Sequence, residues 1–257
     1  MENLNLFDLS GRVALVTGGS KGLGKAIARG FALAGADVVI SSRNQQELQV
    51  ALSEILEGTK QRGISIVADL GRRSDAESLG QAALQKLGRV DILVNNAGTN
   101  IPASIDQVRD EDWDRVLELN LSSCMVLTRA LVPQMKERRW GRVIHISSVL
   151  GLGSKASRST YSATKSALIG LTRASALDLG PFGITVNCIA PGPFSTDLPA
   201  RILSDAEREA FAKHTALGRW GRPEELVGPA LLLASEAGSY ITGSTLLVDG
   251  GTLARTL

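Results

Sequence analysis

A tyrosine and a lysine lie four residues apart in the middle of the chain, at Tyr161 and Lys165. On a helix this spacing places both side chains on one face, one turn apart. A phenol in water ionises only near pH ~10, and a neighbouring ammonium favours its charged form. With the hydroxyl of Ser148 to hold the reacting oxygen, such a pair could move a proton to or from a carbonyl or an alcohol. Taken alone, the spacing fits a surface tyrosine and a solvated lysine equally well.

The elements that must position these three groups follow from the surrounding pattern. Residues 159–179 are rich in Ala and Leu and end at a Gly-Pro pair, which predicts one long helix carrying the tyrosine and the lysine. Residues 141–147 (GRVIHIS) predict a strand that delivers Ser148 at its tip. His145 lies between two isoleucines of that strand, so we expect a core residue rather than a catalyst.

A glycine-rich loop near the N-terminus is the second group with chemical potential. Residues 12–17 predict a buried parallel strand and residues 25–34 a helix. Glycines let the backbone approach a pyrophosphate, and a helix N-terminus offers N–H donors and a positive dipole. The spacing differs from G-x-G-x-x-G, but strand, loop and helix follow in the order that a dinucleotide site needs. The residues expected to contact the cofactor in this loop are Gly18, Ser20, Lys21, Gly22, Leu23 and Gly24.

The end of the next predicted strand, residues 37–42, bears on the choice between NAD and NADP. An acidic residue at this place would bind the ribose hydroxyls of NAD, and none is present. Arg43 could instead contact a 2′-phosphate, and Lys21 adds a second positive charge. Both could also be solvated surface charges. The sequence therefore favours NADP(H) over NAD(H).

Two further strand ends supply candidate cofactor contacts. Asp69 and Leu70 follow the predicted strand 64–68, where the carboxylate could reach the adenine amino group or cap the helix that begins near Ser74. The predicted strand 90–94 leads into small residues and amides that suit a close approach of the cofactor. The contacts expected there are Asn96, Ala97 and Gly98.

A long helix is predicted over residues 110–137, with Asn120 in its middle and Pro133 inside it. An Asn is mildly unfavourable within a helix. It is either a satisfied polar residue or the mark of a backbone distortion that holds a water for a proton path. Pro133 could bend or end the helix.

About seven strands alternate with about six helices along residues 1–257. This rhythm predicts an α/β fold, a single-domain Rossmann-type doubly wound parallel sheet with helices on both faces. Ligands of such sheets bind at the carboxyl ends of the strands. The candidate residues follow the strands in sequence, so we expect them to converge on one site.

Composition and charge narrow the function further. A net charge of +2 gives no strong attraction for nucleic acid or an anionic membrane. No apolar run of transmembrane length and no signal peptide are evident, which favours a cytoplasmic protein acting on a small molecule. The cysteines, Cys124 and Cys188, are expected to be buried and reduced. The two histidines have no ligand partners at suitable spacing, so no metal site is expected.

Taken together, these motifs resemble the short-chain dehydrogenase/reductase family over nearly the whole chain. They are the glycine loop, Asn95-Asn96-Ala97-Gly98, Asn120, Ser148, Tyr161-x-x-x-Lys165 and Pro191-Gly192-x-x-x-Thr196, in that order. The resemblance implies a catalytic tetrad of Asn120, Ser148, Tyr161 and Lys165. Tyr161 would be the acid/base, Ser148 would position the substrate oxygen, Lys165 would bind the nicotinamide ribose, and Asn120 would hold a relay water. Pro191, Gly192 and Thr196 would contact the cofactor at its nicotinamide end, and the family implies a homotetramer.

Within the family the chain is similar to gluconate 5-dehydrogenases and related sugar dehydrogenases, through stretches such as 96–100 and 190–194. A substrate lid is expected at about residues 194–217. The pocket loops carry polar and charged candidates for binding a sugar acid, namely Asn100, Lys155, Arg158 and Arg201.

Two alternatives remain open. A 3-oxoacyl-[acyl-carrier-protein] reductase shares the same tetrad, and Arg138, Arg139 and Arg142 could give it a basic surface for the carrier. Phe182, where many of those reductases have a basic residue, speaks against it. A non-catalytic NADP-binding protein is the other alternative, although all four positions of the tetrad are filled.

Overall fold

The computed structural model describes residues 5–196 and 203–254. The strands are β1 (Val13–Thr17), β2 (Asp37–Ser42), β3 (Gly63–Val67), β4 (Ile92–Asn95), β5 (Gly141–Ile146), β6 (Ile184–Pro191) and β7 (Thr245–Val248). They form one sheet in the order β3-β2-β1-β4-β5-β6-β7, and every pair is parallel. The sheet reverses its winding direction at β1 and β4, which confirms the predicted doubly wound topology.

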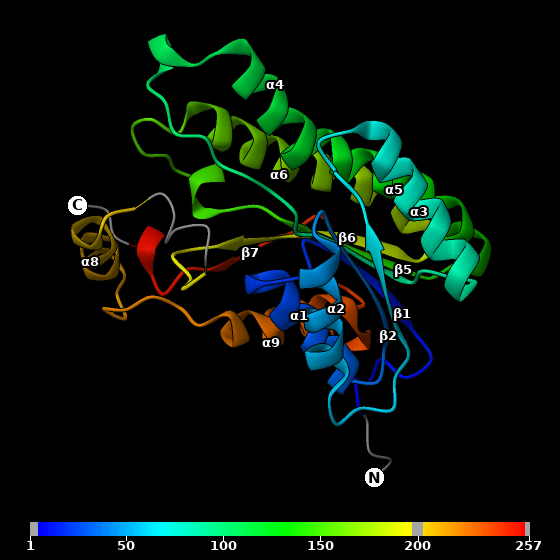
Figure 1. The fold of residues 1–257 in the computed structure, drawn as a ribbon. Coiled ribbons are helices and arrows are strands. Elements are labelled where there is room, and N and C mark those ends of the chain that lie inside the picture. The colour runs from blue at the N-terminus through cyan, green and yellow to red at the C-terminus, as the bar shows by residue number, and fades with distance from the viewer. Residues whose placement is uncertain (1–4, 197–202, 255–257) are drawn as a thin grey trace.

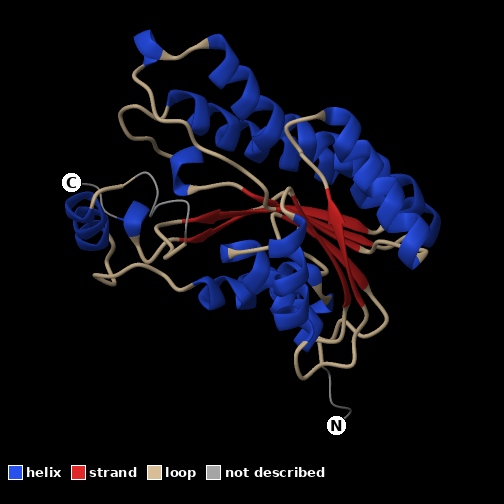
Figure 2. Cartoon of the chain, viewed as in Figure 1, coloured by secondary structure: helices blue, strands red, loops and turns tan. Residues whose placement is uncertain are grey.

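Helices cover both faces of the sheet. They are α1 (Gly22–Leu33), α2 (Gln45–Leu56), α3 (Arg73–Leu87), α4 (Asp110–Leu117), α5 (Ser123–Arg138), α6 (Ser159–Leu179), α8 (Asp205–His214) and α9 (Val227–Ala234). Helices α1, α2 and α9 lie on one face, and α3 to α6 lie on the other (Figure 1). Figure 2 shows the strands as the layer between these two groups.

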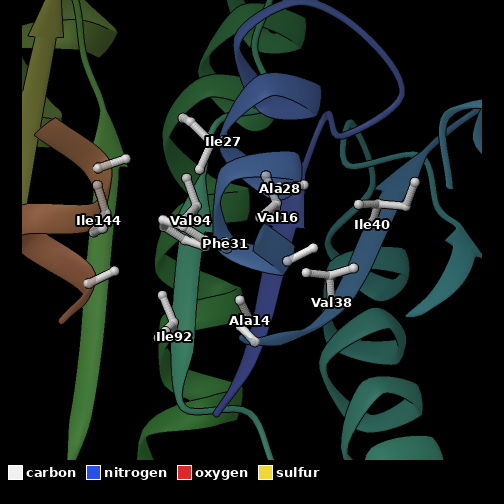
Figure 3. Close-up of a cluster of buried hydrophobic side chains, with 14 of the residues drawn as sticks. Ala14, Val16, Ile27, Ala28, Phe31, Val38, Ile40, Ile92, Val94 and Ile144 are labelled. Carbon is white, nitrogen blue, oxygen red and sulfur yellow. The ribbon is translucent and has the colours of Figure 1, made fainter. Parts of the chain in front are cut away.

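The core explains why the first strand is a continuous apolar run. All five residues of β1 are buried, because helices pack on both faces of a parallel sheet. Its alternate residues Ala14 and Val16 face α1, where they meet Ile27 and Phe31 (Figure 3). Full burial of a side chain such as Phe31 stabilises the fold by about 2 kcal/mol. This packing fixes the start of α1 beside the end of β1, so the glycine loop is held between two rigid elements.

The predicted helix over residues 110–137 is interrupted. A π-helical turn, Glu118–Ser122, separates α4 from α5 and contains Asn120. Such turns widen the helix and often occur at functional sites. The backbone distortion suggested by the mid-helix Asn is therefore present. Pro133 lies inside α5 and does not end it.

By length and composition alone, the stretch Asp110–Arg138 could cross a membrane. In the fold it is part of the layer that covers the sheet, where α5 contacts α3 and α4 contacts α6. A core helix passes the same test of length and composition, so the stretch gives no independent sign of a membrane.

Candidate active site

A cleft of about 940 Å³ opens along the carboxyl ends of the strands. The predicted cofactor and catalytic residues on its wall are Gly18, Ser20, Lys21, Gly22, Leu23, Arg43, Asp69, Leu70, Asn96, Ala97, Gly98, Ser148, Tyr161, Lys165, Pro191, Gly192 and Thr196. Among the residues predicted for the site, Gly24 and Asn120 do not line it. The convergence expected from the strand order is therefore observed.

Hydrogen bonds join the end of β1, where the glycine loop begins, to the loop after β4. Thr17 Oγ1 accepts hydrogen bonds from the main-chain N–H groups of Asn96 and Ala97, both at 3.0 Å. The amide of Asn96 in turn donates to the carbonyl oxygen of Thr17 at 2.8 Å. Gly24 packs behind this junction, since a Cβ there would lie 2.4 Å from the oxygen of Gly18. Gly24 thus allows the close packing of loop and helix and does not face the cleft.

The N-terminus of α1 faces the cleft without a cap. Lys21 at the N-cap makes no side-chain capping bond, and the first turn holds no acidic residue. Its first N–H groups and dipole are therefore available to an anion. Gly22 has a φ of 56°, and a Cβ there would lie 3.3 Å from Thr196 across the cleft. This uncapped helix end and narrow glycine cradle fit the pyrophosphate of a dinucleotide.

The end of the cleft beside β2 contains two cations. Arg43 follows β2 directly, is exposed, and forms no ion pair within the described part of the chain. Lys21 Nζ lies 3.0 Å from a carboxylate oxygen of Glu47 on α2. Asp69 also lines this end, and its side chain accepts a hydrogen bond from the N–H of Gly71 at 3.1 Å. It does not cap α3, whose N-cap is Arg72.

Another part of the cleft wall brings Tyr161, Lys165 and Ser148 together, as predicted. The side chain of Lys165 is only 4% exposed, and its Nζ donates to the carbonyl oxygen of Ile146 at 2.7 Å. The same Nζ lies 5.5 Å from the centre of the Tyr161 ring. Ser148 Oγ accepts a hydrogen bond from the N–H of Leu150 at 3.1 Å, which leaves its own proton to donate into the cleft. One acid/base group, one cation and one hydroxyl donor thus meet at one wall.

Backbone contacts fix the position of the lysine. Ser147 Oγ donates to the carbonyl oxygen of Lys165 at 2.7 Å, so the tip of β5 is joined to α6 at this residue. A Cβ at Gly151 would lie 2.8 Å from the same carbonyl group. These contacts hold the main chain of Lys165 against the end of β5, and the hydrogen bond to Ile146 orients its ammonium.

Asn120 is fully buried beside the catalytic wall. Its Oδ1 accepts from the N–H of Thr99 at 2.8 Å, and its Nδ2 donates to the oxygen of Thr99 at 2.9 Å. It also donates to Thr164 Oγ1 on α6 at 3.2 Å. Asn120 therefore joins the π turn, the loop after β4 and the helix that carries the tyrosine.

The buried groups beneath the cleft are neutral. His145 bonds to Asn95 through Nδ1 at 3.1 Å, and its pKa is lowered to about 4 by burial and by the ammonium of Lys165. It is a core residue, as predicted. Burial raises the pKa of the Cys124 thiol to about 11 and also raises that of Cys188. Both cysteines are buried and free, as expected.

Sequence patterns did not single out several residues of the cleft wall, among them Thr99, Arg115 and Leu119. Thr99 follows Gly98 directly. Arg115 and Leu119 are four residues apart on the segment that leads to Asn120, so helical spacing was the signal that could have found them. Arg115 is exposed and forms no ion pair among residues 5–196 and 203–254.

The proposed pocket-loop residues are more distant from the cleft wall. Lys155 lies 3.5 Å from Glu207 and 4.8 Å from the Phe211 ring, so it joins its loop to α8. Arg158 is buried and donates to the carbonyl oxygen of Ser157 at 2.9 Å. Neither of them lines the cleft, nor does Asn100. Arg201 and the part of the lid at 197–202 lie outside the described residues.

Of the three arginines suggested as a basic surface, Arg139 is exposed, Arg138 is half-buried and Arg142 is buried. These residues lie just before or at the start of β5, at the edge of the sheet opposite the cleft. Arg142 is only 2% exposed, because it stacks on the Trp140 ring at 4.3 Å. Arg138 is half-buried, and its guanidinium donates a hydrogen bond to the carboxylate of Asp91.

Comparisons with known proteins agree with this architecture. The model of the short chain dehydrogenase family matches residues 12–207. A human (Homo sapiens) protein, dehydrogenase/reductase SDR family member 4, is 40% identical over 96% of this chain and 89% of its own length. A gluconate 5-dehydrogenase of Gluconobacter oxydans is 37% identical over 98% of each chain. A 3-oxoacyl-[acyl-carrier-protein] reductase of Rickettsia felis is 36% identical over 96% of this chain and 99% of its own.

The solved structure of a gluconate 5-dehydrogenase from Burkholderia cenocepacia, in complex with NADP and tartrate, is also similar. It has a TM-score of 0.91 and 35% sequence identity, and the match covers 98% of each chain. The fold therefore has a close counterpart over nearly its whole extent.

Proposed function

The chain belongs to the short-chain dehydrogenase/reductase family and is an oxidoreductase acting on CH–OH groups, and from this premise we propose that it uses NADP(H) to interconvert a secondary alcohol and a ketone. The proposed substrate is a sugar or sugar acid, such as gluconate and 5-keto-gluconate. The observation that carries the reaction is the buried ammonium of Lys165 beside the Tyr161 ring, with a main-chain carbonyl as its acceptor. A positive charge held there favours the phenolate form of a neighbouring phenol.

The nicotinamide, when bound, supplies or accepts the hydride. Tyr161 gives a proton to the substrate oxygen in reduction and takes it back in oxidation. Ser148 donates its hydroxyl proton to the same oxygen and so stabilises the negative charge that develops there. Lys165 stabilises the phenolate and would hold the ribose of the nicotinamide when the coenzyme is bound. Asn120 holds the π turn against α6, and we propose that this distortion carries the relay water.

The preference for NADP rests on Arg43, an exposed guanidinium at the end of β2 with no carboxylate partner among the described residues. A guanidinium binds a phosphate through charge-assisted hydrogen bonds. The expected result for Arg43→Ala is weaker NADPH binding with NADH binding unchanged, measured by fluorescence titration. Lys60→Ala is the matched control, since Lys60 is an exposed cation that does not line the cleft. Equal losses for both coenzymes would contradict the assignment.

The sugar-acid substrate is supported by the similarity to gluconate 5-dehydrogenases. The test is consumption of NADPH, followed by absorbance, with 5-keto-gluconate and an acetoacetyl thioester in parallel and Tyr161→Phe as the blank. Turnover of the keto acid alone supports the proposal, and turnover of the thioester alone establishes the reductase alternative. That alternative keeps the support of a relative at 36% identity, although Arg142, one of its three suggested basic residues, is buried.

If neither substrate is turned over but NADPH still binds, a broader panel of carbonyl compounds should be tested as substrates. That outcome would also revive the hypothesis of a non-catalytic NADP-binding protein if the panel failed.

We further propose a single catalytic domain with a lid near residues 194–217, assembled as a cytoplasmic homotetramer. Apolar side chains on the outer helices support the assembly, because Leu177 on α6 is 80% exposed and Trp113 on α4 is 37% exposed. Light scattering coupled to size-exclusion chromatography measures the mass directly. A monomeric mass would refute the tetramer.

A further inference from the structure

The adenosine end of the cleft contains a carboxylate among its cations. Glu47 lines the same wall as Arg43 and Lys21, and it forms an ion pair with Lys21 at 3.0 Å. The glycine loop and the end of β2 are joined here, since the N–H of Gly19 donates to the oxygen of Ser41 at 3.1 Å. The three charges therefore belong to one corner of the cleft.

The position of Glu47 is fixed by its helix. It lies in the first turn of α2, whose N-cap Asn44 accepts hydrogen bonds from the N–H groups of Gln46 and Glu47 at 2.9 and 3.2 Å. The negative side chain is favourable next to this helix N-terminus. The N-terminus of α1, by contrast, has neither a cap nor an acidic residue. The acidic group thus lies beside the adenosine end and not beside the pyrophosphate cradle.

A second ion pair joins the same two helices and provides a comparison for Glu47. Lys25 on α1 pairs with Glu54 on α2, in the same arrangement of donor and acceptor helix. Neither of these residues lines the cleft. Two ion pairs therefore join α1 and α2, and of these two only the pair of Lys21 and Glu47 lines the cleft.

We propose that Glu47 is a specificity-determining residue for the coenzyme: its carboxylate partly neutralises Lys21 and so limits the preference for a 2′-phosphate over a 2′-hydroxyl. This inference rests on the proposed use of NADP. A 2′-phosphate carries between one and two negative charges at neutral pH, and a carboxylate beside its binding cations opposes it. The uncharged 2′-hydroxyl of NAD is affected much less.

The test is a titration of Glu47→Gln with NADPH and NADH, followed by fluorescence. Gln keeps the size of the side chain and suits the first turn of a helix, so the fold is retained. We expect NADPH to bind roughly three- to tenfold more tightly, since one opposing charge a few ångströms from a phosphate is removed in a solvent-exposed corner. NADH should bind with an unchanged affinity. Glu47→Ala should give the same pattern, with tighter binding of NADPH and unchanged binding of NADH.

Glu54→Gln is the matched control and should bind both coenzymes like the wild type. Titration with adenosine 2′,5′-bisphosphate and with adenosine 5′-monophosphate isolates the 2′-phosphate, and only the bisphosphate should gain affinity in Glu47→Gln. Unchanged or weaker NADPH binding in that variant would overturn the proposal, as would a loss of NADH affinity. If the wild type fails to bind NADPH at all, the proposed function fails instead, so the two failures are distinguishable.

Discussion

At the edge where the strands begin, charges are paired, whereas at the edge where they end, charges face the cleft. Asp91, just before β4, is fully buried and accepts bonds from Arg89 and Arg138 and from the N–H of Val13. At the opposite edge, the buried ammonium of Lys165 has no carboxylate partner within residues 5–196 and 203–254, and donates only to a carbonyl oxygen.

A second cluster at the strand-start edge repeats this pairing. The Trp140 ring lies between the guanidinium groups of Arg12 and Arg142, at 3.7 and 4.3 Å from its centre. Glu236 accepts from Trp140 Nε1 at 2.8 Å and pairs with Arg142 at 3.6 Å. One edge of the sheet thus uses its charges to hold the fold. At the other edge, Arg43 and Lys165 have no carboxylate partner among the described residues, so mutations at the two edges should separate stability from activity.

The largest effect is expected at the strand-end edge. Tyr161→Phe removes the proton donor and acceptor but keeps the ring, so kcat should fall by about 10²- to 10⁴-fold, the usual contribution of general acid/base catalysis. Thermal unfolding and NADPH binding should stay close to the wild type. The measurement is NADPH oxidation with the best ketone substrate beside a thermal melt. A variant that keeps more than a tenth of the wild-type kcat would rule out the assigned role.

At the strand-start edge, Asp91→Ala should act on stability. It leaves two guanidinium groups and a main-chain N–H without their acceptor, which should lower the free energy of unfolding by about 3–5 kcal/mol. The folded fraction should still bind NADPH with wild-type affinity, because the cleft lies at the other edge. Denaturant unfolding and coenzyme titration measure the two quantities. A loss of affinity without loss of stability would contradict the division between the edges.

Between the edges, His145 predicts a pH dependence of stability. Its pKa is lowered to about 4 in the fold, so on acidification the unfolded chain takes up the proton first. The stability due to its neutral form is therefore complete above about pH 6.5 and is lost as the pH falls toward about 4, at a cost of about 3 kcal/mol.

The measurement is the free energy of unfolding between pH 7 and about 4. His145→Asn should flatten the curve in that window. His214→Asn, at the exposed second histidine, should leave the curve as in the wild type. The same slope in all three proteins would show that His145 is not the titrating group.

The smallest effect is expected for Glu236→Gln. The carboxylate is 51% exposed, and a partly exposed ion pair contributes at most about 1 kcal/mol. The Gln oxygen can still accept the bond from Trp140. Comparison with Asp91→Ala by the same denaturant titration then measures how much burial matters at one edge. A loss above about 2 kcal/mol would mean that the stacked arginines depend on the charge itself.

Local pattern was sufficient for most of the fold. The predicted helix 159–179 and strand 37–42 are observed with the same bounds, because hydrophobic periodicity and helix-ending residues depend only on neighbouring residues. The distortion at Asn120 was also indicated by a residue that does not favour helix interiors. The glycine loop, Ser148 and the Tyr161–Lys165 pair could be placed at one edge from strand order alone.

What the sequence could not decide is which distant charges meet. Arg142 was interpreted as a surface cation, but the fold places Trp140 and Glu236 around it and buries it. Asn95 ends β4 like its cleft-facing neighbours, yet its side chain turns inward to His145. The pairing of Lys21 with Glu47 likewise depends on the packing of α1 beside α2. Periodicity is a property of neighbouring residues and was determined by the sequence, whereas the partner and burial of each charge depend on segments that only the tertiary structure brings together.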